Sequence, residues 1–127
     1  MKTILFVEDE SALQKTFEDT LKEQGYSVIH ALDGETGLRL AKEKNPDLVL
    51  LDLILPKMSG FEVLEELKQD KATKHIPVII LTNLEDMQNV QKAVDLGATT
   101  YLLKSSYRLE EIVSKVKQAL GETPFSQ

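Results

Sequence analysis

Short apolar runs alternate along the chain with longer segments in which apolar residues recur every three or four positions. The runs at 4–7, 48–51 and 78–81 contain no polar residue, which is typical of strands buried on both faces of a parallel sheet. The longer segments, for example 11–24, have the period of amphipathic helices. The pattern therefore predicts an α/β protein.

Five strands and five helices are expected in strict alternation. The predicted strands cover 3–7, 27–31, 48–51, 78–81 and 100–103, and the predicted helices cover 11–24, 35–44, 61–69, 85–96 and 109–120. Because a helix follows every strand, the strands should run parallel with right-handed crossovers. We expect a flavodoxin-like (βα)5 three-layer sandwich whose five-stranded sheet has the order 2-1-3-4-5.

Local signals mark several boundaries in this pattern. Ser11 and Gln14 have the spacing of a capping box at the start of the first helix, and Gly25 is a natural stop at its end. We expect one domain over residues 1–121 and a C-terminal tail over 122–127.

Three carboxylates follow strands that the expected order places side by side. Glu8 and Asp9 come after the first strand, and Asp52 comes after the third. The carboxyl ends of parallel strands share the edge at which open α/β sheets bind ligands. Clustered carboxylates repel one another unless a cation or a proton intervenes, and oxygen ligands without cysteine suit a hard cation such as Mg²⁺.

Two other strands end at the same edge. The fourth strand is followed by Thr82 and the fifth by Lys104. A hydroxyl and an ammonium beside metal-binding carboxylates form an anion site that would stabilise a phosphoryl group during its transfer. A carboxylate in the middle of that site, Asp52, can act as the nucleophile.

Composition narrows the possible functions further. The chain has 127 residues, with 21 acidic and 15 basic side chains and a net charge of −6, which argues against a dedicated nucleic-acid binder. It contains no cysteine, so disulfides and thiolate metal sites are excluded. The apolar run near the N-terminus is too short for the hydrophobic core of a secretory signal, and no apolar stretch is long enough to span a membrane. We expect a cytoplasmic protein.

Taken together, these strand-end residues resemble those of the receiver domain of two-component response regulators, the CheY-like proteins. The resemblance covers nearly the whole chain, from Lys2 to Leu120. Any one match is weak, whereas the full set, in order and mostly at strand ends, is specific. The matching residues are Glu8-Asp9, Asp52, Leu55-Pro56, Gly60, Thr82, Gly97-Ala98, Tyr101 and Lys104.

The resemblance implies a role for each site residue. Asp52 would accept a phosphoryl group from a sensor histidine kinase or a histidine phosphotransfer protein. Thr82 and Lys104 would contact the phosphoryl oxygens, and Tyr101 would be an aromatic switch that turns inward when Thr82 moves. The ligands of Mg²⁺ would be the side chains of Glu8, Asp9 and Asp52 and the backbone carbonyl of Ile54.

The same resemblance implies a signalling phosphoacceptor rather than an enzyme with a separate substrate. Phosphorylation would switch the face formed by the fourth helix, the fifth strand and the fifth helix, which an unknown output protein reads. We expect a monomer, with a phosphorylation-dependent dimer as an alternative. No direct contact with nucleic acid or membrane is expected.

Several positions depart from the usual receiver pattern. Ser105 follows Lys104, where most receivers have a proline in a cis peptide, and 105–108 is about one residue longer. We expect a trans bond, because a cis bond before a non-proline residue costs about 3–4 kcal/mol. Asn83 stands where most receivers have a smaller residue, and its side chain should narrow the access of water to the phosphoryl group. Ile54 and Leu84 are apolar, so the aspartyl phosphate should hydrolyse slowly.

Two other classes of function remain open at this point. A pseudo-receiver would be a binding module that switches without phosphate. A small phosphohydrolase with an Asp nucleophile would need a second carboxylate as general acid two residues after Asp52, but Ile54 occupies that position. Individual residues also have structural alternatives: Asp9 could cap the first helix, and Tyr101 could be ordinary core packing.

Overall fold

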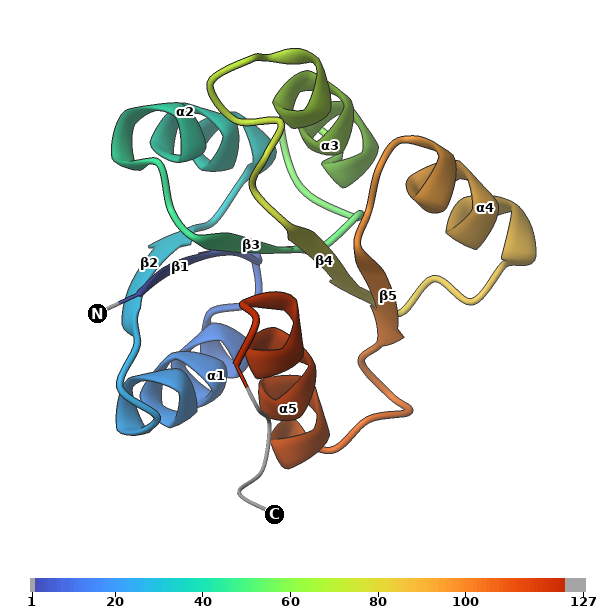
Figure 1. The fold of residues 1–127 in the computed structure, drawn as a ribbon. Helices are drawn as coiled ribbons and strands as arrows, with labels where there is room; N and C mark the ends of the chain where they lie inside the picture. The colour runs from blue at the N-terminus through green and yellow to red at the C-terminus, as the bar shows by residue number, and fades with distance from the viewer. Residues whose placement is uncertain (1, 123–127) are drawn as a thin grey trace.

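A computed structural model describes residues 2–122 and contains the five strands and five helices in the expected alternation (Figure 1). The elements are β1 (Thr3–Val7), α1 (Ser11–Glu23), β2 (Ser27–Ala31), α2 (Gly34–Lys44), β3 (Leu48–Leu51), α3 (Gly60–Gln69), β4 (Val78–Thr82), α4 (Met87–Asp95), β5 (Thr100–Leu103) and α5 (Leu109–Ala119). Four strands have the predicted bounds, and β4 is one residue longer at Thr82.

The strands form one parallel sheet of order β2-β1-β3-β4-β5, which confirms the predicted flavodoxin-like topology. In the register of the central strands, Phe6 is paired with Leu50 and Leu50 with Ile79. Helices α1 and α5 cover one face of the sheet, and α2, α3 and α4 cover the other (Figure 1). The carboxyl ends of β1 and β3 are consequently neighbours, as the arrangement of acidic residues requires.

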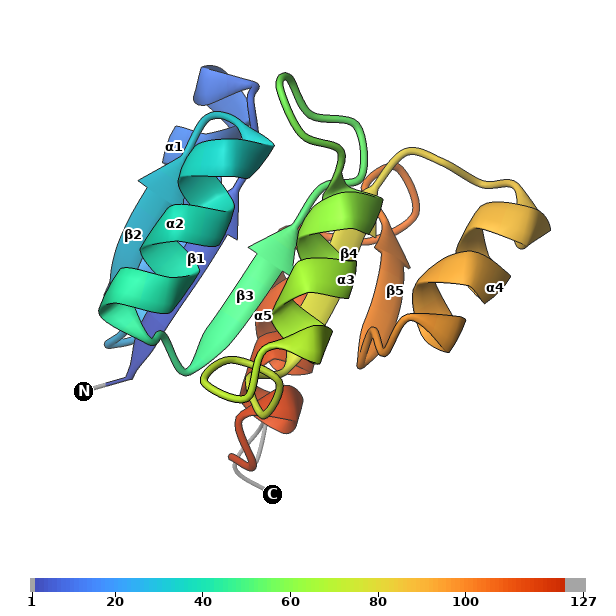
Figure 2. The same cartoon turned by 90° about the horizontal axis from the view of Figure 1, so that it is seen from above.

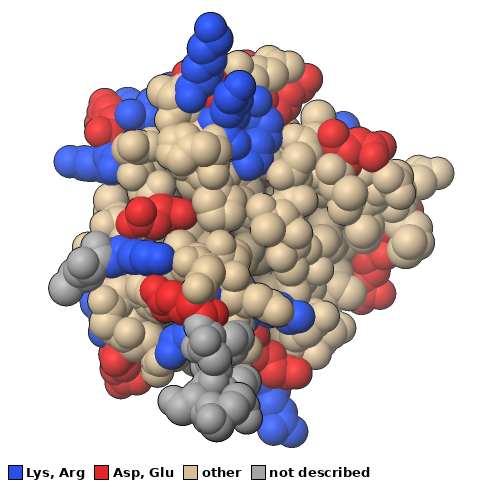
Figure 3. Space-filling model, viewed as in Figure 1, with Lys and Arg blue, Asp and Glu red and all other residues tan. Residues whose placement is uncertain are grey.

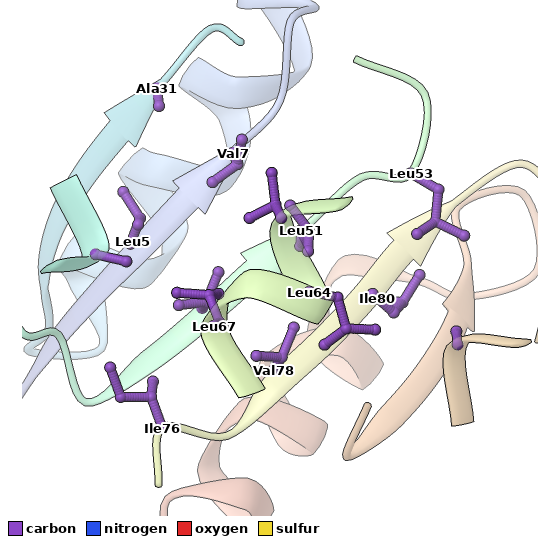
Figure 4. Close-up of a cluster of buried hydrophobic side chains, with 14 residues drawn as sticks. Leu5, Val7, Ala31, Leu51, Leu53, Leu64, Leu67, Ile76, Val78 and Ile80 are labelled. Carbon is purple, nitrogen blue, oxygen red and sulfur yellow. The ribbon is translucent and has the colours of Figure 1, made fainter. Parts of the chain in front are cut away.

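Alternating strand side chains build a separate core on each face of the sheet. Leu5 and Val7 point toward the α2–α4 side, where Leu64 and Leu67 of α3 pack against the strands (Figure 4). Ile4 and Phe6 point toward α1 and α5. Because both faces of each central strand are covered, their sequences are continuously apolar.

Three helix starts differ from the predictions because nearby side chains cap them. Helix α3 begins at Gly60 rather than at residue 61, since the Ser59 hydroxyl accepts a hydrogen bond from the Glu62 backbone N–H at 3.2 Å. Helix α4 begins at Met87 rather than at residue 85, since the Asp86 carboxylate accepts a hydrogen bond from the Gln88 backbone N–H at 2.9 Å. Helix α2 begins one residue early, at Gly34, because Asp33 caps it by accepting from the Thr36 backbone N–H at 2.8 Å.

The predicted capping box at the start of α1 is wrong. The N-cap residue is Glu10, which makes no side-chain capping bond. Gln14 is buried instead, and its Nε2 donates to the backbone carbonyls of Phe6 at 3.4 Å and Ala31 at 3.3 Å. Its amide therefore joins the ends of β1 and β2 beside the acidic residues.

The end of the described chain is held against the start of the sheet. Tyr26 Oη donates to the Glu122 carboxylate at 2.6 Å, and Lys2 Nζ lies 3.7 Å from the same group. The rest of the tail predicted over 122–127 lies outside the described residues. Within residues 2–122 no helix is both long and apolar enough to span a membrane.

Gly60, the first residue of α3, lies directly against the backbone after β3. A Cβ at this position would come within 2.1 Å of the Asp52 carbonyl oxygen and 2.6 Å of the Leu53 Cα. Both neighbours are backbone atoms, which cannot rotate away as a side chain can. The close approach requires glycine here and fixes the position of Asp52 relative to α3.

We expect Gly60→Ala to destabilise the fold by about 3 kcal/mol, near the upper end of the range for overpacking. Helix propensity alone would favour alanine by about 1 kcal/mol, so the two effects have opposite signs. Urea unfolding measures the difference, with Glu65→Ala, at an exposed position of the same helix, as the control. Equal or greater stability of Gly60→Ala would show that the α3 start does not press on Asp52.

Candidate functional site

Residues from four strand ends line one open hollow at the carboxyl edge of the sheet. The loops after β1, β3, β4 and β5 lie together along the upper edge of the view in Figure 2. The hollow has a volume of about 390 Å³. Its lining residues are Glu8, Asp9, Glu10, Asp52, Ile54, Asn83 and Lys104.

Three carboxylates converge in this hollow. Glu8, Asp9 and Asp52 each offer an oxygen, and the three oxygens lie within 4.8 Å of one another. Glu8 and Asp52 are only 1% and 5% exposed, whereas Asp9 is exposed. Such a cluster of oxygen donors is suited to a hard divalent cation. The predicted proximity of the three residues is therefore found.

Backbone hydrogen bonds hold the two buried carboxylates in place. The Glu8 backbone N–H donates to the Ala31 carbonyl at 3.0 Å, and the Glu8 carboxylate accepts from the Glu10 N–H at 3.1 Å. The Asp52 N–H donates to the Val7 carbonyl at 3.1 Å, and its Oδ1 accepts from the Ile54 N–H at 3.2 Å. Both side chains are thus fixed by the ends of neighbouring strands.

Lys104 is bonded to both buried carboxylates. Its Nζ lies 2.5 Å from Glu8 Oε1 and 2.8 Å from Asp52 Oδ2. Burial raises the pKa of the Glu8 carboxyl, although the bond to Lys104 opposes that rise. Burial alone would lower the pKa of Lys104, but its bonds to Asp52 and Glu8 raise it above the ordinary value. The ammonium therefore stays charged and offsets part of the negative charge of the two carboxylates.

Thr82 places a hydroxyl at the same edge, at the end of β4. The residue is fully buried, and its Oγ1 has no hydrogen-bond partner within residues 2–122. A buried polar atom without a partner costs about 1–3 kcal/mol, so such atoms are often found where a ligand completes the bonding. The hydroxyl can therefore donate to an incoming anion.

Tyr101 lies half-buried on β5 and reaches across to the loop after β4. Its hydroxyl donates to the Leu84 carbonyl at 2.8 Å, and burial raises the pKa of the phenol. The ring also packs against the core on the α2–α4 side. Core packing and a polar link to the β4–α4 loop therefore coexist in this residue.

The remaining predicted features have mixed outcomes. Ile54 lines the hollow with its side chain 58% exposed, while the role of its backbone carbonyl stays a prediction. Leu84 is half-buried and does not line the hollow. The backbone of 2–122 contains no cis peptide bond, so the Lys104–Ser105 bond is trans, as expected. Asp9 is not the cap of α1, because Glu10 occupies that position.

Sequence reasoning missed two contributions to the site. The ion pairs of Lys104 with Glu8 and Asp52 were not foreseen, because the sequence shows which residues meet at an edge but not which atoms pair. The burial of Gln14 had a signal: it precedes Phe17 and Leu21 by three and seven positions, so helical periodicity places it on the inward face.

Comparison with known proteins agrees with this arrangement. Residues 4–117 match the family described as the response regulator receiver domain. The DNA-binding dual master transcriptional regulator RpaA of Synechocystis is 39% identical over 123 residues, which make up 97% of this chain and 51% of that protein. The chain spans about half the length of the first curated relatives it matches.

Shorter relatives are matched over nearly their whole length. The polar-differentiation response regulator DivK of Brucella ovis is 33% identical over 95% of this chain and 98% of its own. The receiver domain of the sensor histidine kinase PA1611 of Pseudomonas aeruginosa, solved with a magnesium ion in its active-site cleft, is 26% identical with a TM-score of 0.86 and covers 95% of this chain and 98% of that one. The chain belongs to the response regulator receiver domain family.

Proposed function

We propose that this receiver domain accepts a phosphoryl group on Asp52 from a histidine kinase or a histidine phosphotransfer protein. The observation that carries the proposal is the hollow itself, in which a nearly buried carboxylate lies between an ammonium and two other carboxylates. An Asp52 oxygen would attack phosphorus while the bond to the donor nitrogen breaks. The protein is a signalling phosphoacceptor and needs no separate substrate.

The donor set of the hollow fits Mg²⁺. Glu8, Asp9 and Asp52 supply oxygen ligands only, and Asp9 is exposed, so it is open to a cation from solvent. We infer that these three side chains, together with the Ile54 carbonyl, hold the ion. When bound, Mg²⁺ would neutralise negative charge at the site of phosphoryl transfer.

Lys104 and Thr82 would supply the remaining contacts to the phosphoryl oxygens. Lys104 Nζ already lies 2.8 Å from Asp52 Oδ2, so a phosphoryl group on Asp52 would lie within reach of its ammonium. The Thr82 hydroxyl has no bond to give up in the described residues. The exposed Ile54 side chain offers no group to orient a hydrolytic water, and slow dephosphorylation is the expected result.

We infer that the signal leaves through α4, β5 and α5. Helix α4 has one fully buried residue, Ala93, whereas Met87 and Val94 are 74% and 51% exposed. Its N-terminal loop is linked to β5 by the bond between Tyr101 and the Leu84 carbonyl. A contact of the Thr82 hydroxyl with the phosphoryl group would pull on the same loop and shift a lightly packed helix.

The partners we propose are a phosphoryl donor and an output protein, in the cytoplasm. On the face in Figure 3, basic side chains gather at the top and otherwise alternate with acidic ones around the rim, so this face has no continuous basic surface. Direct binding of nucleic acid by these 127 residues is therefore not proposed. RpaA, a relative about twice as long as this chain, is named as DNA-binding. DNA binding is therefore an output that we would look for only in a longer protein that contains this domain. We propose a monomer, with dimerisation on phosphorylation as the alternative.

Asp52→Asn should abolish phosphorylation while the fold is kept, because the amide preserves the shape but is not a nucleophile. The protein is incubated with Mg²⁺ and a small phosphodonor such as acetyl phosphate, and its intact mass is measured. We expect one phosphoryl adduct on the wild type and on Asp95→Asn, an exposed carboxylate on α4, and none on Asp52→Asn.

The same incubation separates the three classes of function. A lasting adduct identifies a phosphoacceptor, steady release of phosphate without an adduct identifies a phosphohydrolase, and no reaction identifies a pseudo-receiver. An adduct on Asp52→Asn would show that another residue accepts the group.

Asp9→Ala should weaken Mg²⁺ binding by at least about tenfold relative to the wild type. Glu8→Ala should weaken it less. The reason is that the Glu8 carboxylate is already bonded to Lys104 and to the Glu10 N–H, whereas Asp9 is exposed to solvent. Isothermal titration with Mg²⁺ measures both affinities, and Glu10→Ala, in the hollow but outside the cluster, is the control. Equal affinities of Asp9→Ala and the wild type would remove Asp9 from the ligand set.

Lys104→Met should destabilise the Mg²⁺-free protein by about 3–5 kcal/mol at pH 8, because it leaves two buried carboxylates without their cation. The loss should shrink at pH 5. Burial raises the folded-state pKa of Glu8 above its unfolded value, so its penalty is present above the folded pKa and disappears as protonation proceeds at lower pH. Urea unfolding at both pH values tests this, with the exposed Lys71→Met as control. A loss that does not depend on pH would contradict it.

A further inference from the structure

Asn83 follows Thr82 directly and is the one neutral polar side chain among the seven residues that line the hollow. Four of the others are acidic, one is Ile54, and the last is Lys104, whose ammonium is already shared between Glu8 and Asp52. The side chain of Asn83 is exposed at this opening. The hollow thus contains one uncharged hydrogen-bond donor with access to an incoming group.

None of the usual structural reasons for an asparagine in a loop applies to Asn83. Asparagine often adopts a positive φ, but within 2–122 the non-glycine residues that do so are Asn45 and Lys57. Asparagine also caps helices, but the cap of α4 is Asp86. Within the described residues, no hydrogen bond from the Asn83 amide to the loop is found either.

We propose that Asn83 is a phosphoryl-contacting residue, whose side-chain amide donates a hydrogen bond to a phosphoryl oxygen on the solvent side of Asp52. The proposal rests on the phosphoacceptor function proposed above. Lys104 and Thr82 approach the group from the β5 and β4 side of the hollow, at the protein interior. A small residue at position 83 would leave the outer oxygens to water, whereas an amide supplies a fixed donor there.

A neutral donor suits this position better than a second cation. During transfer, an Asp52 oxygen bonds to phosphorus, the P–N bond of the phosphohistidine breaks, and its electron pair stays with the imidazole nitrogen, which takes up a proton. Negative charge remains on the phosphoryl oxygens throughout. An amide N–H stabilises that charge without competing with Mg²⁺ for the carboxylates, which an added ammonium would do.

The test compares Asn83→Ala, Asn83→Asp and the wild type. We expect Asn83→Ala to lower the rate of phosphorylation by acetyl phosphate about tenfold, because one hydrogen bond to the phosphoryl group is lost. Fluoroberyllate mimics a phosphoryl group. In the presence of Mg²⁺, the concentration that half-saturates Asn83→Ala should be higher than for the wild type by a similar factor. Asn83→Asp should lose more, because a carboxylate repels the phosphoryl oxygens.

Two further measurements separate a contact from a steric or structural effect. Mg²⁺ affinity and urea stability of Asn83→Ala should match the wild type, and Gln88→Ala, which removes an exposed amide outside the hollow, should change none of these quantities. If Asn83→Ala is phosphorylated as fast as the wild type or faster, the side chain acts at most as a barrier and the inference is wrong. If the wild type itself takes no phosphoryl group on Asp52, the proposed function is wrong as well.

Discussion

Repulsion among three carboxylates at one sheet edge is the constraint on which the site depends. Glu8 and Asp52 are nearly buried, so their charges are poorly screened, and the Lys104 ammonium offsets part of them. The ammonium comes from β5, two strands away from β3. The charge compensation of the site therefore depends on the parallel sheet, which brings the ends of β1, β3 and β5 to one edge.

The same constraint bears on how the proposed ligands would act. One ammonium offsets only part of the charge of two ionised carboxylates, so a divalent cation or a phosphoryl group in the proposed site would change the contacts of Lys104. The buried Thr82 hydroxyl has no hydrogen-bond partner within residues 2–122, so it has spare bonding capacity at the same edge. Since Thr82 ends β4 and Tyr101 bonds to the following loop, the proposed signal from Asp52 would reach α4 through these two residues.

Most of the architecture was predictable from the sequence because strands such as 48–51 are continuously apolar and helices show a clear period. The expected meeting of Glu8, Asp9 and Asp52 followed from strand order alone. Helix starts were less predictable, because capping by Asp86 and Asp33 depends on local geometry. The ion pairs of Lys104 were beyond prediction, since they depend on side-chain reach and on burial, which sequence spacing does not encode.

The contact between Gly60 and the Asp52 carbonyl has a consequence for how strain is distributed. Because a Cβ on Gly60 would lie 2.1 Å from the Asp52 carbonyl oxygen, α3 packs directly behind Asp52 and leaves its main chain no room to move in that direction. The β3 side of the site is therefore held in place, and in the proposed switch we expect movement on the β4–α4 side. The proposed signal would thus travel toward α4, because the close contact with α3 blocks movement in the other direction.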